Sequence, residues 1–246
     1  MNINNKTVLI TGGGSGIGLE IAKLLSAKNN KVIITGRNAD KLQKAASGLS
    51  NVTTIASDVT NADSVKKLVA TIKADFGGLD ILINNAGNAY SFKLGENVNA
   101  AEKALDEFNT NFFAVLNLTE QLLPTLSASP DAAIVNVTSI VALTPAANIP
   151  TYSASKAALR SYTLALRLAL QDSRVKVFEL MPPLVNTDFS KEIGGENGIP
   201  PIQVAQDLID AFENDKYEIH VGATADIYAL TLKGGNEAFN ALNQNR

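Results

Sequence analysis

Residues 6–18, KTVLITGGGSGIG, decide the fold. Residues 6–10 form a short apolar run typical of a buried strand, and a glycine cluster follows at once. From residue 17 onward, apolar side chains recur every three or four positions, which predicts a helix. A glycine turn between a strand and a helix lets backbone amides at the helix N-terminus face an anion such as a pyrophosphate. The stretch predicts a nucleotide site, and a purely structural tight turn is the alternative.

Strand-like and helix-like segments alternate along the rest of the chain. Strands are predicted at residues 6–10, 31–35, 52–56, 79–83, 132–137, 174–180 and 216–221. Helices are predicted at residues 17–28, 40–49, 64–76, 100–126, 152–170 and 201–213, with a break that could fall near 109–111 and a further helix in the tail. Apolar strands that alternate with helices imply a parallel sheet covered on both faces. We therefore predict one α/β domain over residues 1–246, with a Rossmann-like, doubly wound parallel sheet of seven strands flanked by helices.

Composition excludes several classes of protein. The 246 residues are 46% hydrophobic and 18% charged with a net charge of −3, so the chain is globular and lacks the basic surplus of a nucleic-acid binder. It has no cysteine and one histidine, His220, so we expect no disulfide, no metal site and a purely structural role for that histidine. No apolar run approaches the roughly 18 residues of a membrane span, and the first residues lack a signal-peptide core. We expect a cytoplasmic protein with no membrane span.

The end of the second predicted strand bears on the choice of cofactor. It reads Thr35-Gly36-Arg37-Asn38, whereas sites for NAD place a carboxylate there to bind the ribose 2′-hydroxyl. The guanidinium of Arg37 could bind a 2′-phosphate through two hydrogen bonds, and a solvated turn residue is the alternative. The next acid, Asp40, is predicted to cap the following helix. This pattern favours NADP(H) without excluding NAD(H).

Tyr152 and Lys156 stand four residues apart at the start of a predicted helix. Such residues share one helix face, with their Cβ atoms about 5–6 Å apart. A nearby ammonium lowers the pKa of a phenol, so the pair could transfer protons, although an isolated pair is common by chance. Ser139 follows the fifth predicted strand, at the sheet edge where ligands bind in such folds, and could donate to a substrate oxygen. The segment 84–87, Asn-Asn-Ala-Gly, follows the fourth strand at the same edge.

Taken together, these motifs resemble the short-chain dehydrogenase/reductase family in its short, single-domain form. The matching residues are Thr11-Gly12-x-x-x-Gly16-x-Gly18, Asp58-Val59, Asn84-Asn85-Ala86-Gly87, Asn111, Ser139, Tyr152-x-x-x-Lys156 and Pro182-Pro183-x-Val185-x-Thr187. They follow the family's order and spacing. The segment 179–198 is also similar to bacterial reductases of the DltE type. Two departures stand out: Pro183 occupies a position where the family usually has glycine, and the tail 222–246 does not match the usual ending.

The resemblance implies a role for each matched residue. Cofactor contacts are implied for Gly12, Ser15, Gly16, Ile17, Gly18, Arg37, Asp58, Val59, Asn85, Ala86, Gly87, Tyr152, Lys156, Pro182, Val185 and Thr187. In the implied catalytic set, Tyr152 gives and takes the proton, Lys156 lowers the pKa of that tyrosine, Ser139 orients the substrate oxygen, and Asn111 positions a water. Positions beside these motifs suggest substrate contacts at Asn88, Tyr90, Val141, Leu143, Ile149, Leu184 and Phe189, with residues 186–200 as a lid. Phe112 and Phe113 are expected in the core.

The function that the resemblance implies is an NADP(H)-dependent oxidoreductase. It would move a hydride between nicotinamide and a small carbonyl or alcohol substrate. The alternatives are a non-catalytic dinucleotide sensor or partner-binding protein on the same fold, and an epimerase or dehydratase that retains its cofactor. The resemblance also implies a homodimer or homotetramer, formed through the helices predicted at 100–126 and 152–170.

Overall fold

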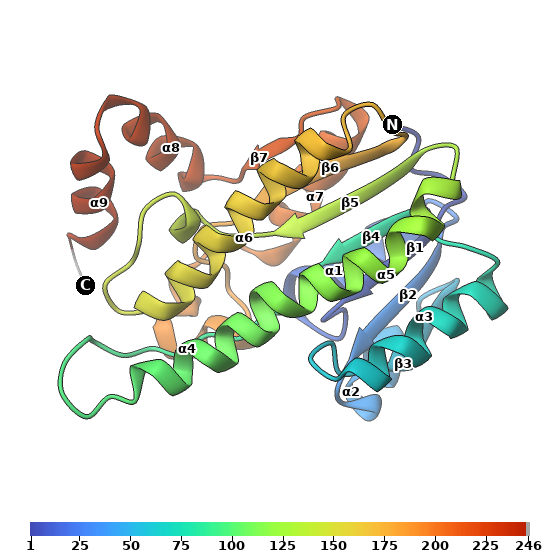
Figure 1. The fold of residues 1–246 in the computed structure, drawn as a ribbon, viewed down its shortest axis with the longest axis horizontal. Coiled ribbons are helices and arrows are strands. Elements are labelled where there is room, and N and C mark those ends of the chain that lie inside the picture. Colours follow the sequence, from blue (N-terminus) through green and yellow to red (C-terminus); the bar gives the residue numbers. More distant parts are fainter. Residues whose placement is uncertain (245–246) are drawn as a thin grey trace.

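A computed structural model describes residues 1–244 and shows a parallel sheet with helices on both faces (Figure 1). Its strands are β1 (Thr7–Thr11), β2 (Lys31–Gly36), β3 (Val52–Ala56), β4 (Ile81–Asn84), β5 (Ala132–Val137), β6 (Val175–Met181) and β7 (Glu218–His220). They lie in the order β3-β2-β1-β4-β5-β6-β7, and each neighbouring pair is parallel. The predicted doubly wound sheet is confirmed. The strand order reverses between β1 and β4, so the crevice for a ligand opens at the carboxyl ends of these strands.

Helices form a layer on each side of the sheet. The first layer holds α1 (Gly16–Ser26), α2 (Ala39–Ala46) and α7 (Pro201–Glu213). The second holds α3 (Ala62–Phe76), α5 (Ala114–Ala128) and α6 (Pro150–Ala169), with α4 (Ala100–Phe108) running into α5 (Figure 1). None of the helices in residues 1–244 combines the length and apolar character needed to cross a membrane.

Alternation along the strands builds a separate core on each face. Val8 and Ile10 of β1 pack with α1 and α7, while Leu9 between them packs with α3 and α5. Successive strand residues point to opposite faces, so a strand buried on both sides must be apolar at every position. This explains why the strands read as continuous apolar runs in the sequence.

The expected break in the long helix is confirmed as a π-helical turn. The chain leaves α4 at Phe108, forms the turn over Asn109–Phe113, and resumes as α5 at Ala114. A π-turn widens the helix by one residue and leaves a backbone carbonyl outside the regular hydrogen-bond ladder. Asn111 lies in this turn, fully buried.

Two local predictions were wrong. The cap of α2 is Asn38, whose side chain accepts from the amide of Lys41, and Asp40 lies inside the first turn. Asn is as good an N-cap as Asp, and here it precedes the helix by one position. Phe113 is 53% exposed and not a core residue, because the π-turn directs it to the outer surface of the helix layer.

The divergent tail forms α8 (Ala223–Lys233) and α9 (Gly235–Asn243), beyond the β7 edge of the sheet (Figure 1). Apolar side chains of this hairpin pack against the segment between β5 and α6; the cluster includes Ile140, Val141, Leu143, Ala146, Ile149, Tyr152, Ile227, Leu230, Ala238 and Leu242. The side chain of Asn243 accepts from the amide of Ala147 at 2.7 Å and donates to the carbonyl of Pro145 at 2.9 Å. The tail therefore supports the segment that joins Ser139 to Tyr152.

Candidate active site

The glycine loop between β1 and α1 requires glycine at several positions. Gly12 and Gly16 have φ of +65° and +54°, in the left-handed region that side chains disfavour. A Cβ at Gly18 would lie 2.6 Å from the side-chain nitrogen of Asn85, so α1 packs closely on the segment after β4. Ser15 precedes α1 without a side-chain capping hydrogen bond. The first amides of the helix are thus available to an anionic group.

Thr11 fastens the segment after β4 to this loop. Its hydroxyl oxygen accepts from the amides of Asn85 and Ala86, both at 3.0 Å. In return, the side chain of Asn85 donates to the carbonyls of Thr11 and Gly12, at 2.9 and 3.1 Å. Thr11 was part of the motif in the sequence, but only the fold shows that its hydroxyl links the glycine loop to the segment after β4 by hydrogen bonds.

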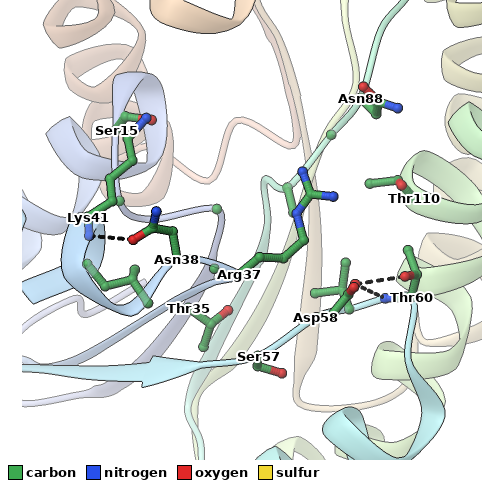
Figure 2. A pocket seen from close by; sticks show the side chains of 17 residues that line it. Ser15, Thr35, Arg37, Asn38, Lys41, Ser57, Asp58, Thr60, Asn88 and Thr110 are labelled. Carbon is green, nitrogen blue, oxygen red and sulfur yellow. Dashed lines mark hydrogen bonds between the residues drawn. The ribbon is translucent and has the colours of Figure 1, made fainter.

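The first cleft lies beside the carboxyl ends of β1, β2 and β3. Arg37 extends into its middle, between the side with Ser15 and Lys41 and the side with Asn88 and Thr110 (Figure 2). Predicted cofactor residues that line it are Gly12, Ser15, Arg37, Asp58, Val59, Ala86 and Gly87. Asn88, predicted as a substrate contact, also lines this cleft.

Asp58 and Arg37 are electrostatically coupled in the first cleft. Burial acts to raise the pKa of Asp58, but hydrogen bonds from the hydroxyl and amide of Thr60 and the charge of Arg37 outweigh it, so the pKa is lowered. Asp58 is therefore an ionised acceptor (Figure 2).

Sequence reasoning missed Lys41 as a residue of the first cleft. It lies on the first turn of α2, four residues after Arg37, and its ammonium is 3.2 Å from the carboxylate of Asp188. No local pattern in the sequence pointed to Lys41, because Arg37 lies before the N-cap Asn38 and outside the helix that carries Lys41.

A second cleft continues from the first across the glycine loop. Both clefts are lined by Gly12, Ser15, Ala86 and Gly87. The second cleft adds Gly16, Ile17 and Asn85 on one side, and Val137, Thr138, Tyr152, Lys156, Pro182, Thr187 and Phe189 on the other. Residues far apart in the sequence thus line one continuous groove along the carboxyl edge of the sheet.

A third cavity adjoins the second. Its lining is mainly apolar and includes Ser139, Ile140, Val141, Ile149, Pro183, Leu184, Val185 and Ile193. Five residues line both the second cleft and the third cavity, namely Ile17, Tyr152, Pro182, Thr187 and Phe189. Tyr152 therefore stands on the boundary between them, with the ring of Phe189 at 5.9 Å.

Tyr152, Lys156 and Ser139 form a buried polar group at this boundary. The amine of Lys156 donates to the carbonyl of Val137 at 2.8 Å and lies 5.6 Å from the ring centre of Tyr152. Burial lowers the pKa of Lys156 to about 8. Burial also raises the pKa of Tyr152; a hydrogen bond with Ser139 opposes this rise, and the charge of Glu107 adds to it. At neutral pH the phenol is therefore protonated and able to donate.

The side chain of Asn111 forms hydrogen bonds with neighbouring protein groups. It accepts from the amide of Asn88 at 2.8 Å and donates to the carbonyl of Asn88 and the hydroxyl of Ser155, at 2.8 and 2.9 Å. Both hydrogens of the side-chain amide are therefore used within the protein, and its oxygen keeps one acceptor site.

Some predicted substrate residues lie outside the third cavity. Val141, Ile149, Leu184 and Phe189 line it, but Asn88, Tyr90 and Leu143 do not. The hydroxyl of Tyr90 donates to Asp106 at 2.6 Å, and Leu143 packs in the cluster with the tail.

Comparisons with known proteins agree with this geometry. Residues 6–198 match the family model for short chain dehydrogenase. A protein of Bacillus subtilis (strain 168), "Uncharacterized oxidoreductase DltE", is 38% identical over 226 residues, 89% of each chain. An uncharacterised oxidoreductase of Staphylococcus aureus (strain USA300) is 32% identical over 223 residues, 87% of this chain and 94% of that one.

Solved structures show the same fold. A short chain dehydrogenase from Burkholderia cenocepacia J2315 in complex with NADP is 27% identical, with a TM-score of 0.86 over 98% of both chains. A short chain dehydrogenase/reductase from Burkholderia phymatum in complex with NAD has a TM-score of 0.83 over 89% of both chains, at 22% identity.

Proposed function

The chain belongs to the short-chain dehydrogenase family, and we propose that it is an NADP(H)-dependent oxidoreductase that interconverts a carbonyl and an alcohol on a small molecule. One observation carries the proposal: Tyr152 lines both the groove along the glycine loop and the apolar cavity beside it. A proton-transferring group is useful at that boundary, where a reacting carbonyl would meet a cofactor.

The residues of the groove fit a nicotinamide dinucleotide. The uncapped start of α1 and the glycines before it suit the pyrophosphate, and Arg37 supplies the donors for a 2′-phosphate. Asp58, Val59 and residues 85–87 would hold the adenosine and the riboses, while Pro182, Val185 and Thr187 would contact the carboxamide. When bound, the nicotinamide would supply or accept the hydride.

The protein's own part in the reaction is to orient the substrate oxygen and to move a proton. Ser139 would hold that oxygen by a hydrogen bond, and the hydroxyl of Tyr152 would deliver the proton to it. Lys156, whose amine is buried beside the tyrosine ring, would stabilise the phenolate that remains. Asn111, through its main-chain carbonyl in the π-turn, would hold a water that returns a proton from solvent.

The apolar third cavity favours a neutral or weakly polar carbonyl compound as substrate. The test is NADPH oxidation, followed by absorbance, across a panel of aldehydes, ketones and quinones. Turnover of at least one class is expected. Binding of NADPH without turnover of any class would favour the non-catalytic sensor, and tightly co-purifying NAD would favour an epimerase or dehydratase.

Arg37 provides a test of the cofactor choice. NADPH at about 100 times its dissociation constant should stabilise the protein by about 2.7 kcal/mol, and NADH at the same concentration should stabilise it much less. In Arg37→Ala this difference should vanish, because the donors to the 2′-phosphate are gone. Thermal unfolding with each cofactor measures both effects.

The control for Arg37→Ala is Arg174→Ala, at an exposed arginine before β6, which should keep the preference for NADPH. Equal stabilisation of the unsubstituted protein by both cofactors would contradict the cofactor assignment. If neither cofactor stabilised it, the glycine loop would not be a working site.

We also infer that the protein self-associates through α4 and α6. Large apolar side chains are exposed on these helices and on the π-turn that follows α4, namely Leu105, Phe113, Leu164 and Leu168. Leu168→Glu is expected to convert the dimer or tetramer to smaller species, because it places a charge in the apolar contact. Size-exclusion chromatography with light scattering measures the mass.

Leu232→Glu is the matched control for this interface. Leu232 is 73% exposed on α8 and Leu168 is 67% exposed on α6, so both changes are tolerated by the fold. If Leu232→Glu dissociated the oligomer and Leu168→Glu did not, the interface would lie on the tail. A monomeric unsubstituted protein would rule out the association.

A further inference from the structure

Two cationic side chains line the first cleft, and the proposed function uses only one of them, Arg37. The other is Lys41, on the first turn of α2. A phosphate monoester carries a charge between about −1.5 and −2 at neutral pH. Arg37 has a single positive charge, and the ionised carboxylate of Asp58 already offsets part of it. A 2′-phosphate bound in this cleft is therefore not neutralised by Arg37 alone.

The side chain of Lys41 is directed toward the glycine loop. It runs from α2 toward Ser15, on one side of the space that Arg37 enters (Figure 2). A Cβ at Gly14 would lie 3.8 Å from Cγ of Lys41, so the stem of the lysine passes close to the loop. The ammonium is thus placed to bind an anion held between Ser15 and Arg37.

The lid brings an anion of its own to the same ammonium. Thr187 of the lid lies against the glycine loop, since a Cβ at Gly16 would be 3.0 Å from its Cγ2. The next residue, Asp188, begins a short 3₁₀ helix, and its carboxylate lies 3.2 Å from the ammonium of Lys41. In residues 1–244, Asp188 is the one hydrogen-bond partner of this ammonium. A carboxylate at this distance offsets the attraction of the lysine for any other anion.

We propose that Lys41 is a second specificity-determining residue for the 2′-phosphate of NADP(H), and that Asp188 of the lid competes with this phosphate for its ammonium. The inference rests on the cofactor proposed above. The two side chains are 49% and 82% exposed, so water weakens their pair and a dianionic phosphate can displace the carboxylate. Lys41 acts together with Arg37 and does not replace it, because a lysine that is half exposed and paired with Asp188 holds a phosphate only weakly.

Two substitutions at exposed positions test the two parts of this inference. Lys41→Met removes the charge and keeps most of the stem, and Asp188→Asn removes the competing charge at nearly constant size. The controls remove the same charges from the same helices at other exposed positions, by Lys44→Met on α2 and Glu192→Gln on the lid. Fluorescence titrations at low salt, where screening is weak, give the dissociation constants for NADPH and NADH.

Lys41→Met is expected to weaken NADPH binding by about 3- to 10-fold, with NADH binding nearly unchanged. Asp188→Asn is expected to strengthen NADPH binding by about 2- to 5-fold, again with little effect on NADH. The two controls should leave the ratio of the dissociation constants unchanged. An unchanged ratio in Lys41→Met would remove the lysine from the phosphate site. Weaker NADPH binding in Asp188→Asn would mean that the lid carboxylate holds the lysine in place, and the competition would be wrong.

The double variant Lys41→Met/Asp188→Asn separates competition from direct repulsion. If Asp188 acts by neutralising the lysine, its removal should no longer improve NADPH binding once the ammonium is gone. A gain that persisted in the double variant would show that the carboxylate repels the phosphate directly, and would overturn the competition.

These titrations need no substrate, so they distinguish this inference from the proposed function. The expected pattern in a protein that turns over no carbonyl would count against the oxidoreductase and not against Lys41. A preference for NADPH that is lost in Arg37→Ala and kept in Lys41→Met would leave the cofactor assignment standing and overturn this inference. An unsubstituted protein with no preference for NADPH would overturn both.

Discussion

Tyr152→Phe is expected to lower kcat for carbonyl reduction by roughly 10²- to 10⁴-fold, the usual contribution of a positioned acid or base. The ring remains to pack against Phe189 and the tail cluster, so the change removes only the hydroxyl. Affinity for NADPH should stay within a few fold, because the glycine loop and Arg37 are untouched. Steady-state kinetics and a fluorescence titration with NADPH measure the two quantities.

Tyr162→Phe is the matched control for this experiment. Tyr162 lies on the same helix, against the ring of Phe112 and away from the clefts, and its replacement should leave kcat unchanged. Full turnover by Tyr152→Phe would remove the tyrosine from the mechanism. Loss of NADPH binding in that variant would show that the hydroxyl is needed to bind the cofactor and not to transfer the proton.

The second large effect concerns stability. Arg160→Met is expected to destabilise the fold by about 3–5 kcal/mol, because it leaves a buried carboxylate without its cation. Glu179 on β6 is 0% exposed; its Oε2 accepts from Arg160 at 2.6 Å, and its Oε1 accepts from the hydroxyl of Thr138 at 2.8 Å. Burial raises the pKa of Glu179, and the charge of Arg160 opposes that rise. Urea unfolding at neutral pH measures the loss.

Two variants check the cause of that loss. Lys66→Met breaks the exposed pair with Asp63 and should cost no more than about 1 kcal/mol. Adding Glu179→Met to Arg160→Met should recover most of the stability, since an apolar pair of similar size can replace a buried ion pair. A loss below about 1 kcal/mol in Arg160→Met would mean that water already screens this pair.

The pair is also relevant to the active site. Arg160 lies one helical turn after Lys156, and Thr138 precedes Ser139 directly. The Thr138–Glu179–Arg160 chain therefore ties β5, β6 and α6 together just behind the residues proposed for catalysis. Partial loss of activity in Arg160→Met at temperatures where it remains folded would follow from this link.

Most elements of the fold could be predicted because each strand and helix carries its own local pattern. Residues 52–56, 132–137 and 201–213 match β3, β5 and α7, and other boundaries differ by a few residues. The cap at Asn38 and the exposure of Phe113 could not be predicted. In each case, a shift of the helix by one residue changes the outcome, and the spacing of apolar residues is compatible with either position. The tail was predicted only as a helix, because its partner surface, residues 140–149, is set by the sheet.

For the candidate site, the sequence was informative wherever backbone geometry or a strand end dictates the residue. Glycines at positions 12, 16 and 18, and the serine after β5, follow from the turn and from the polarity of a parallel sheet. Lys41 and Asp188 carry no such local signal. Their significance depends on a contact between two segments that are distant in the sequence.

The sequence by itself determined the doubly wound sheet, the glycine turn and the membership of the family, since periodicity, special backbone conformations and motif spacing are local properties of the chain. Only the tertiary structure decided that Tyr152 stands between two cavities, that the tail supports the segment after Ser139, and that Lys41 lies beside Asp188 of the lid. Packing brings together residues that are distant in the sequence, and burial then sets the pKa values and the strength of each charge.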